Sequence, residues 1–332
     1  MLSYIGRRLL QLIPLMLLLS VLIFVIIELP PGDYLTMRIL ELQQNGTNVA
    51  EAEIQRLKMT YGLDKSMSYR YFQWVGNMLR HGKFGRSFQW EKPVKEVIGD
   101  RAILTLVVAV LTLLLTYVIA IPIGIYASTH QYSIGDYLLT FIGFIGLSVP
   151  GFMLALLLLY FSFTVLGLSV TGLFSPEYAT AAWSLAKVGD MLKRIWIPIL
   201  IVGLAGTAGL IRTMRAMMLD ELRKQYVVTA RAKGVAETKL LFKYPVRVAI
   251  NPVVSTVGWL LPRIISQTPL VAVVLNLPTL GPILLRSLQY QDMYLAGSIL
   301  LILSLMTVIG TVMSDIMLVY LDPRIRYGGV GK

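Results

Sequence analysis

Residues 212–252 read RTMRAMMLDELRKQYVVTARAKGVAETKLLFKYPVRVAINP and lie between two hydrophobic runs. The stretch contains nine Lys and Arg residues but only three acidic ones. Short loops rich in Lys and Arg stay on the cytoplasmic side of a membrane, because their positive charge sets the orientation of the neighbouring spans. We therefore predict that residues 212–252 form a cytoplasmic loop between the fourth and fifth membrane spans.

The same stretch has the pattern of two helices. Apolar residues recur every three or four positions from Met214 to Val227, which predicts a helix that continues to Ala232. A second, short helix is predicted from Ala236 to Tyr244, where Pro245 ends it. Gly234 lies between the two, and glycine permits the chain to turn sharply. We expect an elbow that projects from the membrane and bends at residues 232–234.

The composition of the chain is typical of an integral membrane protein. Of its 332 residues, 56% are hydrophobic and 14% are charged, whereas about 25% of the residues of a soluble domain are charged. The mean hydropathy is +0.70. A net charge of +12 is then better explained by residues beside the membrane than by nucleic-acid binding. The hydrophobic runs predict six spans, at residues 9–27, 102–126, 137–168, 195–211, 253–275 and 295–321.

The predicted fold is therefore an all-α membrane protein with six transmembrane helices. Six spans place both termini in the cytoplasm, where the loops and tails would hold fourteen Lys and Arg, against four in the two short external loops at residues 169–194 and 276–294. We divide the chain into the N-terminus and first span (1–29), an external segment (30–101) and a five-helix core (102–332). Pro150 and Gly151 predict a kink in the third span, which is longer than one helix needs.

Two features of this organisation leave alternatives open. Glycines at three-residue steps in the fourth span (Gly203, Gly206 and Gly209) either permit close helix contact or are merely tolerated. In the external segment, residues 40–57 are expected to be helical, and a later apolar stripe has helical spacing. This stripe belongs either to a lid that contacts a substrate-delivery protein or to a helix lying at the membrane interface; its members are Tyr71, Trp74, Val75, Met78 and Leu79.

Residue counts and motifs argue against several kinds of chemistry. The chain has no Cys and two His, so thiol nucleophiles and His-built metal sites are not expected. No Gly-x4-Gly-Lys-Ser/Thr motif occurs, so ATP is not bound here through a phosphate loop. We expect no catalytic residue, metal or cofactor in this chain; ATP and Mg²⁺, if they drive transport, belong to other subunits.

The segment Tyr226–Gly234, YVVTARAKG, resembles the coupling motif of permeases of ATP-binding-cassette (ABC) importers. The general motif has Glu, Ile and Pro where this chain has Val228, Tyr244 and Arg247, and these departures match the dipeptide/oligopeptide branch. Further segments resemble the same branch along nearly the whole chain; they are Arg7–Gln11, Pro31–Asp33, Tyr61–Asp64 and Leu321–Tyr327.

This resemblance implies a permease subunit in the cytoplasmic (inner) membrane of a bacterium or archaeon. Its partners would be a second, similar permease, two ATPase subunits and an external substrate-binding protein. Peptides are the implied substrate, but the branch also includes importers of oligosaccharides, glutathione and nickel. A secondary transporter, which predicts inverted repeats, and an intramembrane enzyme, which needs a catalytic pair within the spans, are the rival classes.

The resemblance also assigns residues. The second helix of the elbow would dock in a groove on an ATPase, while the alternative for its charges is attraction to the membrane surface. The expected coupling residues are Thr229, Ala230, Arg231, Ala232, Lys233, Gly234, Glu237, Lys239, Leu240, Phe242 and Lys243.

Charges inside the spans point to a second set of residues. A charge at the bilayer centre costs roughly 2.5–3.5 kcal/mol, so Arg263 and Asp315 need a partner or a water-filled cavity. Arg263 either meets a substrate carboxylate in the transport path or forms a buried pair with another helix or subunit; Asp315, near the inner end of its span, is interpreted as structural. The expected path-lining residues are Ser148, Arg263, Ser266, Gln267 and Thr268.

Overall fold

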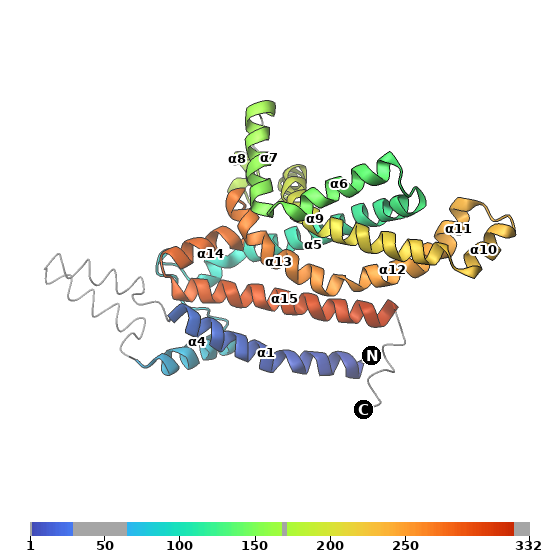
Figure 1. Ribbon diagram of the computed structural model, residues 1–332. Coiled ribbons are helices and arrows are strands. Elements are labelled where there is room, and N and C mark those ends of the chain that lie inside the picture. Colours follow the sequence, from blue (N-terminus) through green and yellow to red (C-terminus); the bar gives the residue numbers. More distant parts are fainter. Residues whose placement is uncertain (1, 29–64, 168–170, 322–332) are drawn as a thin grey trace, which may run out of the picture. The chain divides into compact units, whose positions relative to one another are not determined.

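The computed structural model describes residues 2–28, 65–167 and 171–321 (Figure 1). Within these ranges the chain is helical and contains no strand beyond one isolated bridge, between Arg86 and Pro93. The prediction of an all-α protein is confirmed. The helices are α1 (Leu2–Glu28), α4 (Met67–His81), α5 (Val94–Thr129), α6 (Ile134–Ser148), α7 (Gly151–Leu166), α8 (Pro176–Ala179), α9 (Leu185–Leu222), α10 (Gln225–Ala232), α11 (Glu237–Lys243), α12 (Pro245–Ser255), α13 (Val257–Val274), α14 (Leu280–Gln289) and α15 (Met293–Leu321).

Between four and six helical segments of the described chain are long and apolar enough to cross a membrane. Four are single helices, Leu10–Glu28, Val94–Thr129, Val257–Val274 and Met293–Met313. Two more are bent pairs: α6 with α7, bent by 110°, and the two halves of α9, bent by 58°. The predicted number of six is reached if each bent pair is one span.

The bend between α6 and α7 is much sharper than the predicted kink (Figure 1). Pro150 lacks a backbone N–H and excludes the helical conformation from the residue before it. Val149 is accordingly extended, with φ −96° and ψ 124°. The helix therefore stops at Ser148 and starts again in a new direction at Gly151.

Three boundaries differ from the predictions. Helix α5 starts at Val94 rather than at residue 102 and includes a non-helical Gly99, while α9 begins at Leu185 inside the predicted external loop 169–194. The hydroxyl of Ser184 accepts a hydrogen bond from the Lys187 N–H (3.2 Å), which caps this early start. The predicted external turn at 276–294 contains α14, and the expected helix at 40–57 lies outside the described residues.

The described contacts divide the chain into two compact units, described here separately. The first comprises residues 105–278 with both chain ends, and its helices approach closely at several glycines. A Cβ on Gly146 would lie 2.9 Å from the Leu204 carbonyl oxygen, and one on Gly203 would lie 3.0 Å from the Thr116 hydroxyl. Close contact is thus confirmed at Gly203 and at Gly206, whereas Gly209 has nothing within 4 Å.

The second unit comprises residues 9–104 and 279–305. Trp74 of α4 is buried against Ile23 and Leu301, so the predicted apolar stripe is real at its centre, but Leu79 is 77% exposed and does not belong to it. A second cluster joins the start of α5 to α14 and α15; its buried members are Val94, Val97, Ile98, Leu280, Ile283, Leu295 and Ile299. The proposed division at residues 30 and 102 stays a prediction.

Asp292, which sequence reasoning missed, is a fully buried carboxylate in this second unit. It accepts hydrogen bonds from the Ser87 hydroxyl and from the backbone N–H groups of Gln89 and Leu295, both at 3.2 Å. Burial raises the pKa of Asp292, and these hydrogen bonds oppose that rise. The residue thus ties the loop after α4 to the first turn of α15.

We predict that Gly146→Ala destabilises the first unit by about 1–3 kcal/mol, because its Cβ would push against the α9 backbone, which does not yield as a flexible side chain does. The thermal stability of the detergent-purified protein, followed by size-exclusion fluorescence, measures the effect. The matched control is Gly209→Ala in α9, which has open space for a Cβ and should keep or slightly raise the stability. Equal losses in both variants would contradict the packing argument.

Candidate functional site

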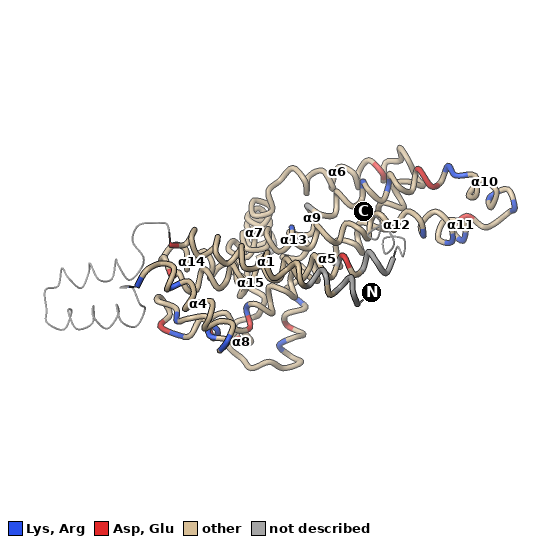
Figure 2. Tube along the Cα trace, turned by 90° about the horizontal axis from the view of Figure 1, so that it is seen from below, with Lys and Arg blue, Asp and Glu red and all other residues tan. Residues whose placement is uncertain are grey.

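The predicted elbow is present as two short helices, α10 and α11, joined by residues 233–236. They belong to the first unit and follow directly on α9, with α12 starting after them at Pro245 (Figure 1). Lys and Arg residues gather on these two helices in the charge view (Figure 2). Hereafter "the elbow" means residues 225–243.

The inner side of the elbow has a small hydrophobic core of its own. Val227, Ala230 and Leu240 are buried, at 0%, 7% and 0% exposure, and Val235 and Tyr244 pack against them. Leu240 is the side chain of α11 that faces α10. Of the expected coupling residues, Ala230 and Leu240 therefore hold the two helices together and are not available to a partner.

At the bend, α10 is terminated by a glycine, Gly234, and both hydrogen bonds typical of a glycine-terminated helix are present. Gly234 has φ +74°, a left-handed conformation that only glycine adopts without strain. Its N–H donates to the Arg231 carbonyl (3.0 Å), and the Val235 N–H donates to the Ala230 carbonyl (3.3 Å). This pair of bonds defines a Schellman motif, and the contact of Val235 with the buried core is the apolar contact that accompanies it. The sequence prediction of a bend at Gly234 is confirmed.

One ion pair crosses the bend. The Arg231 guanidinium donates two hydrogen bonds to the Glu237 carboxylate, from Nε to Oε2 (3.1 Å) and from Nη2 to Oε1 (2.5 Å). This pairing lowers the pKa of Glu237 and raises that of Arg231. A lowered carboxylate pKa stabilises the fold above its ordinary value of 4.5, and that stabilisation is lost as the pH falls below it. Both side chains are about half exposed, so the pair contributes less than about 1 kcal/mol.

The entry to the elbow differs from the prediction of one helix from Met214 to Ala232. Helix α9 ends at Leu222, and Lys224 is extended (φ −70°, ψ 144°) before α10 begins. The Tyr226 hydroxyl donates a hydrogen bond across this break to the Glu221 carboxylate. Partial burial, followed by this bond and the negative charge, raises the pKa of Tyr226 to about 12. Apolar periodicity does not reveal such a break, because the spacing of apolar residues continues on both sides of it.

The outer side of the elbow is exposed and has mixed chemistry. Phe242 is 61% exposed and Val228 is 47% exposed. Arg231 follows Val228 by three residues on α10, and Lys239 precedes Phe242 by three on α11, so each apolar side chain has a cation at helical spacing. Lys and Arg outnumber the acidic residues on these two helices (Figure 2). The expected coupling residues exposed here are Thr229, Arg231, Ala232, Lys233, Gly234, Glu237, Lys239, Phe242 and Lys243.

The expected path-lining residues do not form one cluster facing the same way. Arg263 and Ser266 are exposed on α13, whereas Thr268 is buried and donates its hydroxyl to the Ile264 carbonyl (2.6 Å). Ser148 is exposed at the end of α6, and Gln267 is half-buried. Arg263 makes no ion pair with any other residue that the structure describes, and Asp315 is half-buried on α15. Their role in a path stays a prediction.

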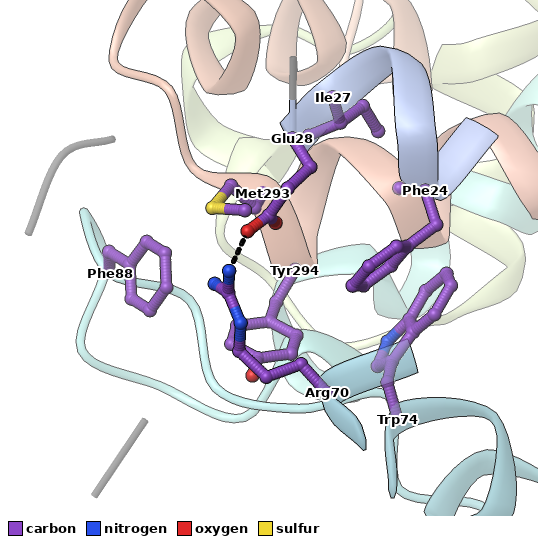
Figure 3. A pocket seen from close by; sticks show the side chains of 9 residues that line it. Phe24, Ile27, Glu28, Arg70, Trp74, Phe88, Met293 and Tyr294 are labelled. Carbon is purple, nitrogen blue, oxygen red and sulfur yellow. Dashed lines mark ion pairs between the residues drawn. The ribbon is translucent and has the colours of Figure 1, made fainter. Parts of the chain in front are cut away.

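A charged pair in an aromatic pocket was missed by sequence reasoning (Figure 3). In the second unit, Arg70 of α4 forms an ion pair with Glu28 at the end of α1, beside the rings of Phe24, Trp74 and Tyr294. The rings of Phe24 and Trp74 lie 5.8 Å apart. The two charges neutralise each other, and the ion pair holds α4 against α1. In the described residues no group of His, Asp and Glu is placed to hold a metal ion.

Comparison with known proteins gives the same assignment as the motif at the elbow. Residues 120–327 match the family described as the binding-protein-dependent transport system inner membrane component, and residues 1–109 match its N-terminal part. The oligopeptide transport system permease protein AppB of Bacillus subtilis is 33% identical over 98% of this chain and 100% of its own. The glutathione transport system permease protein GsiC of Escherichia coli K12 is 30% identical over 98% and 100%, respectively. A putative peptide permease protein of Brucella ovis is 30% identical over 98% and 99%. The chain therefore belongs to the peptide-type permeases of ABC importers, the inner-membrane components of binding-protein-dependent transport systems.

Proposed function

We propose that this chain forms half of a translocation path and that its elbow couples the path to ATPase subunits. Its companions are a second, similar permease, two ATPases and an external substrate-binding protein. The observation that carries the proposal is the composition of the exposed residues of the elbow: Phe242 and Val228 are exposed, and exposed cations lie one helical turn from each. An apolar anchor surrounded by charge has the composition of a protein-binding surface.

The coupling mechanism we propose is mechanical. The elbow has its own core and the Schellman turn, so it can move as one rigid piece when the ATPases close. It follows α9 across only two residues, Arg223 and Lys224, and a displacement of the elbow is therefore passed to α9 and α12. A rigid-body movement of this kind is one of the standard switching transitions of proteins.

Peptides are the substrate class we propose. The named relatives transport oligopeptides, peptides or glutathione, which is itself a small peptide. An oligosaccharide or another small solute remains the alternative for the same architecture. Mass spectrometry of the ligand carried by the external binding protein distinguishes these substrates, and stimulation of uptake by ATP rather than by an ion gradient excludes a secondary transporter.

We also propose that the elbow and both chain termini lie in the cytoplasm. The short loop at 212–252 holds nine Lys and Arg residues, and loops of that composition are retained on the cytoplasmic side. This orientation places the long segment 30–101 outside, where a binding protein would approach.

We predict that Phe242→Ala weakens binding of the ATPases by about 30-fold, equivalent to the roughly 2 kcal/mol of an interface hot spot. Co-purification of the ATPases with the tagged permease, together with transport-coupled ATP hydrolysis, measures it. Phe72→Ala is the control, because Phe72 is also exposed (71%) but lies on α4. Retained ATPase binding by the Phe242 variant, with normal membrane insertion, would refute the docking surface.

Gly234→Ala should destabilise the elbow by about 1–2 kcal/mol, because an alanine in the left-handed conformation is strained even where space is available. Coupled ATP hydrolysis should fall while insertion and spans are unaffected. Gly234→Asn is the matched variant, since asparagine tolerates this conformation better, and it should retain more coupling than the alanine variant. Similar activities for both variants would argue against a rigid bend.

Exchanging the charges of Arg231 and Glu237 distinguishes two roles for Arg231: a partner for Glu237 within the elbow, or a partner for an acidic residue of an ATPase. If its main partner is Glu237, the double variant Arg231→Glu with Glu237→Arg should restore most of the coupling lost in either single variant. If Arg231 instead pairs with an acidic residue of an ATPase, the double variant should stay uncoupled. Since the intramolecular pair is half exposed, we expect recovery of less than about 1 kcal/mol from it.

A further inference from the structure

A groove lies between α6 and the second half of α9 in the first unit, and neither coupling nor the predicted path uses it. Its cavity volume is about 260 Å³, and the groove is partly open to its surroundings. The two helices run antiparallel along it: Asp136 faces Arg215 at one end, Gly143 lies against Ala208, and Gly146 lies against Leu204. The two glycines let the helices approach closely, and Gly143 lines the groove.

The length of the groove fits one leaflet of a bilayer. Leu147 lies eleven positions after Asp136 along α6, which at ~1.5 Å per residue is about 16 Å. The hydrocarbon core of a bilayer is roughly 30 Å thick, so half of it is about 15 Å. At the far end the chain breaks at Pro150 and turns away.

One end of the groove carries an unbalanced positive charge. The Asp136 carboxylate accepts hydrogen bonds from the Arg215 guanidinium (2.8 Å) and from the Tyr132 N–H (3.1 Å), so its charge is offset by Arg215. Arg212 lines the same end, is exposed, and makes no ion pair with any residue in the described part of the chain. Two guanidinium groups against one carboxylate leave a net charge of +1.

The rest of the groove is apolar or aromatic. Leu147 and Phe144 line it and are 39% and 52% exposed, and Tyr137, closer to the charged end, is 63% exposed. Tyrosines at the border between apolar and charged regions are typical of the membrane interface. The groove is therefore amphipathic along its length: cationic at one end and apolar at the other.

We propose that this groove binds an anionic phospholipid, with the phosphate at Arg212 and an acyl chain lying along Phe144 to Leu147. Basic pockets between membrane helices bind anionic head groups in this way. A free phosphate would leave the apolar length uncovered, and a zwitterionic lipid would not offset the extra charge. The inference rests on the proposed function only in placing the charged end at the cytoplasmic leaflet, since Arg212 lies on the part of α9 that leads to the elbow.

The test uses the intact transport complex, stripped of lipid in detergent and examined by native mass spectrometry. With added phosphatidylglycerol we expect bound lipid on the wild-type complex, and about fivefold weaker binding for Arg212→Gln, the loss expected for one cationic side chain. Arg223→Gln removes the same charge outside the groove and should bind as the wild type does. Phosphatidylcholine should bind more weakly than phosphatidylglycerol, and inorganic phosphate should neither bind nor compete.

Three results would overturn the proposal: equal lipid binding by the wild type and Arg212→Gln, equal losses in both arginine variants, or competition by inorganic phosphate. Burial of the groove by another protein chain would also overturn the proposal. Because the chain has no Cys, Tyr137→Cys adds a unique thiol, and its cross-linking to the companion permease in the membrane would show that protein covers the groove. ATPase co-purification should be normal for Arg212→Gln, so a failure here is distinguishable from a failure of the coupling proposal.

Discussion

The constraint on which this fold depends is that a bilayer offers no hydrogen bonds to the backbone. Every N–H and C=O at that depth must be paired within the protein, and helices do this most simply. Breaks in a helix are therefore tolerated only where other groups cover them. At the break at Val149–Pro150 the hydrogen bonding continues up to and from the change of direction: the Val149 N–H donates to the Ile145 carbonyl, and the N–H groups of Met153 and Leu154 donate to the Pro150 carbonyl.

This constraint on backbone hydrogen bonds does not apply to the elbow, because the elbow lies outside the candidate spans. Its helices have eight and seven residues, too short to be stable alone in water. They persist because three buried side chains, a left-handed glycine and one ion pair hold them against each other. The shape of the elbow is therefore set by its own contacts, as the proposed transmission of movement requires.

Helix positions and the elbow could be read from the sequence because their signals are local. Apolar periodicity, Gly234 and Pro245 are each interpretable within a few residues, and the bend was predicted at the right place. The pairs Asp136–Arg215 and Ser87–Asp292 join residues 79 and 205 positions apart, and no periodicity reports such contacts. The end of α9 at Leu222 was missed for the opposite reason, since the apolar pattern continues through a break that only the backbone angles reveal. The early start of α9 was missed because Lys187 and other charges suggested a loop, although Lys187 is buried between Phe174 and Trp183.

The uninterrupted run of α9 from Gly206 to Leu222 has a consequence for how such proteins change over time. An α-helix turns by about 100° per residue, so one residue gained or lost in this run would rotate the elbow, and Phe242 with it, about a quarter of the way round the helix axis. Deletions and insertions in this helix are therefore expected to survive only as near-whole turns of about 3.6 residues, or when a compensating change follows before Lys224. Sequence length between the last membrane-buried turn and the elbow should thus be far more strictly preserved than the identity of the residues that fill it.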